Sequence, residues 1–150
     1  MPKWAKILLI TLGSLLLLGA IVTVIVIAAG VYLWNTEGKK FAESSVKSVQ
    51  EGEAFGRKSE NRQCIPEAVN RFKQDTGLGG TIGAKIFLSS CLKTSRETPN
   101  FCEGVPRRFD FAKSGAWQQE KCRDAGLADE ANCPQLFDAV QDHCEKKGGN

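Results

Sequence analysis

A run of 27 residues without a charged side chain, Ile7–Leu33, constrains this chain more than any other feature. It consists almost entirely of Leu, Ile, Val, Ala and Gly. A bilayer core needs about 20 apolar residues in a helix, and at about 1.5 Å per residue this run spans about 40 Å. Trp4 before the run, and Tyr32 and Trp34 at its end, suit the two membrane interfaces. The sequence therefore predicts a transmembrane helix over residues 7–34.

A cleaved signal peptide is the alternative for this segment, because Lys3 and Lys6 could form its positively charged start. The apolar part of a signal peptide usually spans only about 7–15 residues. Residues 27–29, Ile-Ala-Ala, resemble a cleavage site only weakly. Length therefore favours an uncleaved signal anchor that follows a short N-terminus, residues 1–6.

The cysteines indicate the orientation of this anchor. Lysine counts leave it open, because Lys3 and Lys6 precede the run while Lys39, Lys40 and Lys47 follow it. All six cysteines also follow the run, and small domains with many cysteines are typical of oxidising compartments. We therefore expect a cytoplasmic N-terminus and a C-terminal domain outside the cytoplasm, in the periplasm or the extracellular space.

The charge balance gives no sign of a nucleic-acid partner. Two of the 20 Lys and Arg residues precede the apolar run and all 17 Asp and Glu residues follow it, so the part after the run has a net charge of +1. A nearly neutral domain lacks the basic surface that binds nucleic acid. The residues that remain, on the order of 100, suit one small domain.

Residues 35–62 form a polar segment that predicts a helical stalk. Val46 and Val49 lie on a narrow apolar stripe, while Gly52 and Gly56 weaken the helix. A flexible linker is the alternative interpretation.

Residues 63–147 predict a disulfide-rich helical domain, with a tail at 148–150. Apolar side chains recur at helical spacing after Cys64, from Ala84, from Phe109 and after Cys133, and no alternating strand pattern is present. The predicted fold class is therefore all-α, with one N-terminal transmembrane helix followed by a small disulfide-stapled domain of about four helices.

Helix geometry selects one disulfide pattern. Cys64 and Cys91 lie symmetrically about a glycine-rich turn, so they face each other in an antiparallel hairpin. Cys133 and Cys144 lie on one helix about 16 Å apart, beyond the roughly 7 Å between Cα atoms that a disulfide spans. A turn near Gly126 lets neighbouring helix ends meet. The predicted pairs are Cys64–Cys91, Cys102–Cys144 and Cys122–Cys133.

No motif predicts a metal, a cofactor or a catalytic residue. The cysteine spacings are too long for a zinc site, and C-x-x-C is absent. Asp142, His143 and Cys144 suggest a catalytic group, but consecutive residues on a helix point in different directions. We interpret Cys144 as a disulfide cysteine beside a surface histidine.

The least regular part of the domain follows Asn100. Irregular loops on a rigid scaffold often carry contacts. We expect Phe109, Phe111 and Trp117 to pack in the small core. The predicted binding surface comprises Phe101, Glu103, Gly104, Val105, Pro106, Arg107 and Arg108.

These features predict a membrane-anchored, extracytoplasmic binding or accessory protein. Its expected partners are the lipid bilayer, through residues 7–34, and another protein of the envelope or of a membrane complex. The alternative is a small envelope hydrolase, in which a cavity would hold two close carboxylates with perturbed pKa values. The acidic residues considered for such a site are Glu67, Asp75, Asp110, Glu120 and Asp138.

Overall fold

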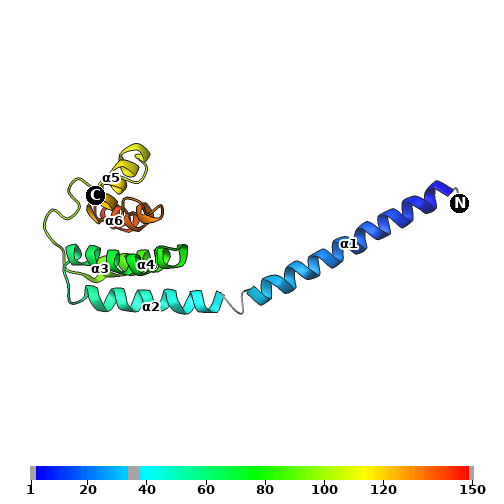
Figure 1. Cartoon of the computed structure of the whole chain (residues 1–150), viewed down its shortest axis with the longest axis horizontal. Coiled ribbons are helices and arrows are strands. Elements are labelled where there is room, and N and C mark those ends of the chain that lie inside the picture. Colours follow the sequence, from blue (N-terminus) through cyan, green and yellow to red (C-terminus); the bar gives the residue numbers. More distant parts are fainter. Residues whose placement is uncertain (1–2, 34–37, 149–150) are drawn as a thin grey trace. The chain divides into compact units, whose positions relative to one another are not determined.

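The computed structural model describes residues 3–33 and 38–148, and all regular structure in these ranges is helical (Figure 1). The parts of the predicted N-terminus, membrane segment, linker and tail that fall on residues 1–2, 34–37 and 149–150 lie outside the described residues. Contacts divide the chain between Ala42 and Glu43 into two compact units. The helices are α1 (Lys3–Leu33), α2 (Lys39–Gly56), α3 (Asn61–Gln74), α4 (Leu78–Thr94), α5 (Phe111–Asp124) and α6 (Cys133–Gly148).

Helix α1 contains the predicted apolar segment. Its stretch Gly13–Tyr32 has 20 residues, a mean hydropathy of 2.7 and no buried residue. The hydroxyl of Thr23 donates a hydrogen bond to the carbonyl oxygen of Gly19 at 2.8 Å, so this polar group is satisfied within the helix. In length and composition, this helix suits either a membrane span or a signal sequence.

Helix α2 belongs to the packed domain from Glu43 onward, which corrects the expected count of about four helices. Its buried glycines, Gly52 and Gly56, lie directly against α4. A Cβ atom at Gly52 would lie 2.5 Å from the carbonyl oxygen of Phe87, and one at Gly56 would lie 2.5 Å from that of Cys91. The two glycines that weaken a helix in the sequence therefore permit its close packing, and the domain has five helices among the described residues.

Helices α3 and α4 form the hairpin that the cysteine spacing predicts. The disulfide Cys64–Cys91 joins their outer ends, with 5.8 Å between the Cα atoms and both residues fully buried. Helix α3 begins at Asn61, three residues before Cys64, so Pro66 lies inside the helix. A capping box at Glu60 provides the earlier start.

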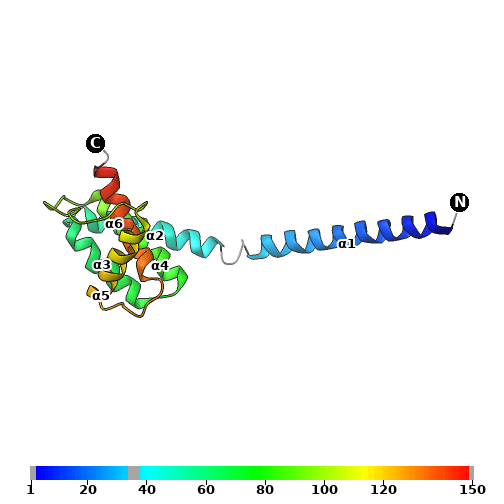
Figure 2. The ribbon, with the colours of Figure 1, turned by 90° about the horizontal axis from the view of Figure 1, so that it is seen from above.

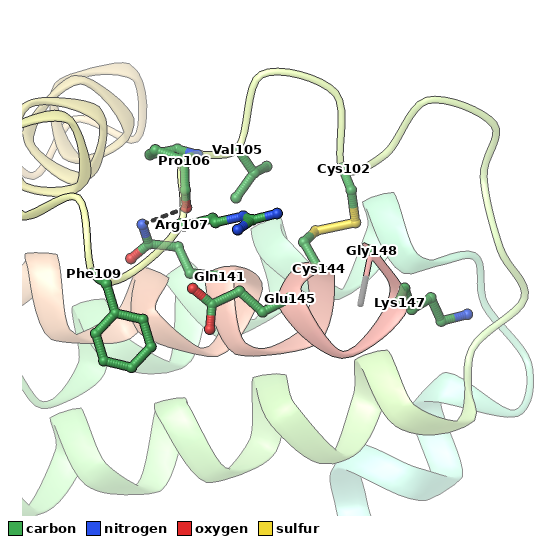
Figure 3. Close-up of a pocket in the computed structure, with 10 residues that line it drawn as sticks. All are labelled: Cys102, Val105, Pro106, Arg107, Phe109, Gln141, Cys144, Glu145, Lys147 and Gly148. Atoms are coloured by element: carbon green, nitrogen blue, oxygen red, sulfur yellow. Dashed lines mark hydrogen bonds between the residues drawn. A yellow bond between two sulfur atoms is a disulfide. The ribbon is translucent and has the colours of Figure 1, made fainter. Parts of the chain in front are cut away.

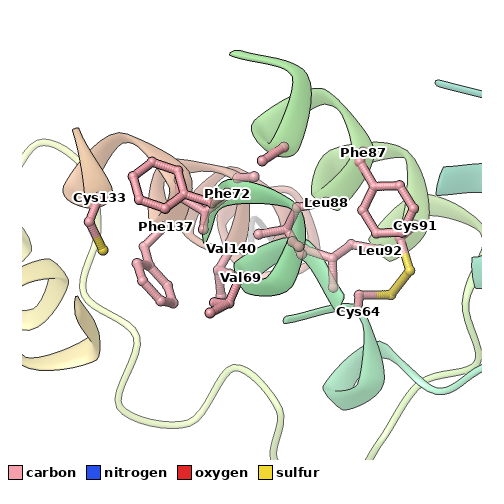
Figure 4. Close-up of a cluster of buried hydrophobic side chains, with 14 of the residues drawn as sticks. Cys64, Val69, Phe72, Phe87, Leu88, Cys91, Leu92, Cys133, Phe137 and Val140 are labelled. Carbon is pink, nitrogen blue, oxygen red and sulfur yellow. A yellow bond between two sulfur atoms is a disulfide. The ribbon is translucent and has the colours of Figure 1, made fainter. Parts of the chain in front are cut away.

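Helix α4 is central to the domain, since it packs against both α3 and α6, and α6 in turn packs against α5 (Figure 1). The core lies between these helices, and Figure 4 shows side chains from α3, α4 and α6 converging in it. Its largest fully buried apolar side chains are Phe72, Phe87, Leu88, Leu92, Leu136 and Val140.

The three disulfides are the pairs that helix geometry selects. Cys122–Cys133 closes the turn between α5 and α6. Cys102–Cys144 ties the irregular segment between α4 and α5 to α6. Figure 2 accordingly shows this segment beside the last turns of α6.

Candidate binding surface

The irregular segment between α4 and α5 follows α4 at Ser95 and ends at Asp110. It is built from short turns, in which the amide of Phe101 donates to the carbonyl of Thr98 at 3.2 Å and that of Val105 to Cys102 at 3.3 Å. Gly104 has a positive φ of 75°, a conformation that glycine adopts without strain. The predicted binding surface therefore lies on a segment fixed at Cys102 by a disulfide.

A cavity of about 610 Å³ lies between this segment and α6 (Figure 3). Five residues of α6 line the cavity, and four of them are spaced i, i+3, i+4 and i+7, which places these four on one helix face. Three residues of the predicted surface, Val105, Pro106 and Arg107, line it, together with Phe109 and the Cys102–Cys144 disulfide. The remaining lining residues are Gln141, Glu145, Lys147 and Gly148.

The buried amide of Gln141 holds this segment in place. The side chain is fully buried, and its Nε2 donates to the carbonyl oxygen of Pro106 at 3.1 Å and to the Ser114 hydroxyl at 2.9 Å. Its Oε1 accepts a hydrogen bond from Gln118 at 2.7 Å. The Gln141 side chain therefore connects the cavity wall to α5. The sequence did not identify this residue as part of a binding surface.

Arg108 is a structural anchor of the surface. Its guanidinium lies 2.5 Å from the carboxylate of Asp142, which raises the pKa of Arg108. Its backbone amide donates to Glu145 Oε1 at 2.5 Å. The neighbouring guanidinium of Arg107, in contrast, has no ion pair or hydrogen bond to any residue in the described part of the chain.

Phe109 and Phe111 are exposed, so the prediction that both pack in the core is wrong. Their exposed fractions are 84% and 81%. Asp110 between them caps α5 by accepting a hydrogen bond from the amide of Lys113 at 3.3 Å. The Lys113 side chain also binds Asp110, and these hydrogen bonds lower the pKa of its carboxyl. Trp117 does face the core, with its ring edge-on to that of Phe137.

Two further residues of the predicted binding surface, Phe101 and Glu103, line a second cavity of about 720 Å³. His143 also lines it, with its ring 5.9 Å from that of Phe101. Burial, together with the charge of Lys146, lowers the pKa of His143. Its neighbours in sequence point elsewhere, since Asp142 binds Arg108 and Cys144 forms a disulfide.

The carboxylates considered for a hydrolytic site do not converge. Glu67 binds Arg71 at 3.1 Å, and Asp138 binds Lys85 at 2.6 Å. Asp75 accepts a hydrogen bond from the amide of Gly77. Within residues 3–33 and 38–148, no cluster of three or more His, Cys, Asp or Glu residues is arranged to hold a metal ion.

Comparison with known proteins does not extend these observations, since no family model, curated protein or solved structure matches the chain.

Proposed function

We propose that this chain is a membrane-anchored binding or accessory protein whose disulfide-bonded domain docks on another protein outside the cytoplasm. Helix α1 supports the anchor, because it is long and apolar enough to cross a bilayer. Three disulfides in a small domain support an oxidising compartment. In this proposal α1 is an uncleaved signal anchor, with its N-terminus in the cytoplasm.

The exposed pair of Phe109 and Phe111 is the observation that carries the docking role. Burying one phenylalanine side chain contributes about 1.5–3 kcal/mol, so the pair could supply about 3–6 kcal/mol before the costs of association. Aromatic residues and arginine are enriched in the centres of protein interfaces. Here Phe109 lines the same cavity as Arg107, and Phe111 follows two residues later as the first residue of α5.

Hydrogen bonds and an ion pair hold the backbone that presents these rings, which lowers the cost of binding. Asp110 fixes the start of α5, Arg108 is bound to α6, and Gln141 holds the carbonyl of Pro106. A surface that is already ordered loses little conformational entropy when a partner binds.

Site-specific photocrosslinking in native membranes tests the proposal. A photoreactive phenylalanine analogue is placed at Phe109, at Phe111 and, as a control, at Leu78, an apolar residue at the start of α4 that is 64% exposed. We expect the two phenylalanine positions to yield the same discrete protein adduct, and the Leu78 position to lack it.

Adducts with lipid alone at both phenylalanine positions would identify a membrane-facing surface and overturn the docking role. Equal adducts at all three positions would indicate nonspecific contact and would also overturn it.

A further inference from the structure

The cavity that Arg107 and Phe109 line presents both charged and apolar side chains. We propose that it binds an extended acidic segment of the partner protein, with a carboxylate of that segment paired with Arg107 and an apolar neighbour packed on Phe109. This inference rests on the proposed docking function and specifies the chemistry of the partner.

The charge pairing around the cavity singles out Arg107. The other lining cation, Lys147, binds Glu97, while Arg108 binds Asp142 and Lys113 binds Asp110. Arg107 is the lining cation without such a partner among the described residues. An anion that enters the cavity therefore meets, in Arg107, a guanidinium that forms no ion pair with any of the described residues.

The surroundings of Arg107 strengthen such a pair. Figure 3 shows its guanidinium in the middle of the ring of lining residues, pointing toward the Cys102–Cys144 disulfide. Val105, Pro106 and Phe109 contribute apolar wall. A ligand that fills the cavity excludes water from these surfaces, and an ion pair gains strength when water is excluded.

The one carboxylate among the lining residues, Glu145, forms no ion pair with Arg107. Its Oε1 accepts the hydrogen bond from the backbone amide of Arg108 at 2.5 Å. The guanidinium of Arg107 consequently keeps its planar set of donors, which matches the two oxygens of a carboxylate.

The extent of the surface favours a protein segment over a small molecule. A volume of about 610 Å³ lies within the usual range of ligand pockets. Phe109 lines the cavity yet is 84% exposed, and Phe111, two residues further on, is 81% exposed and does not line it, so a small ligand in the cavity would leave apolar surface uncovered. A segment with an acidic residue next to an apolar one satisfies both parts of the surface.

Peptide selection tests the chemistry without knowledge of the partner. The full chain, held in nanodiscs of zwitterionic phosphatidylcholine, is used to select from a phage library of random heptapeptides. Arg107→Gln is the test variant and Arg123→Gln is the control, because Arg123 is also exposed but lies in the last turn of α5 and does not line the cavity. Intact disulfides and an unchanged circular dichroism spectrum verify folding of each variant.

We expect the unmodified chain and Arg123→Gln to select peptides with Asp or Glu beside an apolar residue, and Arg107→Gln to lose that acidic preference. In titrations, exchange of the selected acid for its amide should weaken binding to the unmodified chain by about tenfold or more, as for a charge-assisted pair. The same exchange should have no effect on binding to Arg107→Gln.

The outcomes separate this inference from the proposed function. A selected motif without an acid, or an acidic motif that Arg107→Gln retains, would overturn the role of Arg107 and leave docking in place. If the unmodified chain selects no motif, and photocrosslinking at Phe109 and Phe111 gives no protein adduct, both proposals fail.

Discussion

Single glycines set the distance between α2 and α4. At Gly56 a Cβ atom would lie 2.5 Å from the carbonyl oxygen of Cys91, which is rigid backbone. Gly56→Ala should therefore force the helices apart and lower the free energy of unfolding by about 1–3 kcal/mol. Gly115→Ala is the matched control, because a Cβ there meets no atom within 4 Å inside α5, and it should stabilise by about 0.5–1 kcal/mol. Urea denaturation of the full chain in detergent micelles measures both, and equal effects would contradict close packing of α2.

One residue, His143, should make the free energy of unfolding depend on pH in a range above that in which carboxylates titrate. Burial, with the nearby charge of Lys146, lowers the pKa of His143 in the folded chain below its ordinary value of 6.5. The unfolded chain then binds a proton at a pH where the folded chain does not. Stability should be full above about pH 6.5, fall as the pH drops through that value, and level off below the folded pKa.

The measurement is the denaturation midpoint between pH 7.5 and 5.5, with His143→Gln as the comparison. The variant should lose most of the dependence in this window. If the stability of His143→Gln depended on pH as strongly as that of the unmodified chain, the pH dependence would belong to other groups.

At residue scale the sequence could not place Phe109 and Phe111, and the reason lies in α5. The face of α5 that packs on α6 is partly polar, because Ser114 and Gln118 bind the buried Gln141. Apolar spacing therefore placed Trp117 correctly but not Phe111, and Phe109 lies before the helix begins. The sequence predicted Arg107 as part of a binding surface. It could not show that Arg107 lacks an acidic partner, because this depends on which ion pairs form in the folded domain.

At the scale of elements, the geometry of a helix was more useful for predicting the disulfide pairs than for predicting where each helix begins and ends. A fixed rise per residue excludes a disulfide within α6. Together with the glycine-rich turn after Asp75 and the turn near Gly126, this limit leads to three pairs that agree with the structure. The packing of α2 was not predictable in the same way. Gly52 and Gly56 disfavour a helix by propensity, and only a neighbouring backbone gives them a favourable role.

The irregular segment should depend on its disulfide for order. The Cys102–Cys144 bond closes a loop of 42 residues, which corresponds to about 4 kcal/mol of restricted entropy in the unfolded chain. In the double variant Cys102→Ser, Cys144→Ser, we expect trypsin to cleave at Arg107 and Arg108 at least about tenfold faster, because the segment opens locally at lower cost. Mass spectrometry of a digestion time course identifies the cut sites.

The matched control for this digestion removes a different bond, Cys122–Cys133, which lies at the turn before α6. In that double variant, trypsin should cleave at Arg107 and Arg108 much more slowly than in the variant that lacks the Cys102–Cys144 bond. Comparable rates in the two variants would mean that global stability, rather than the local tie, protects the segment.

For the molecule as a whole, the proposed topology joins an apolar helix that has no buried residue between Gly13 and Tyr32 to a domain without a free thiol. In right-side-out vesicles, external protease should remove the domain and leave an N-terminal epitope tag protected. A maleimide reagent should label six cysteines only after reduction, since all six are paired. Intact mass decides between an anchor and a signal peptide, because an uncleaved chain retains its full 16.4 kDa.

The double variant Val22→Arg, Val26→Arg provides the control for insertion. Each arginine near the centre of a membrane helix costs about 2.5–3.5 kcal/mol, so the pair should reduce insertion and shift the chain to the soluble fraction. Because a cytosolic domain would be kept reduced, its cysteines should then react with maleimide without prior reduction. Reactive cysteines in the unmodified chain, or a protected domain, would refute the proposed orientation and with it an extracytoplasmic docking role.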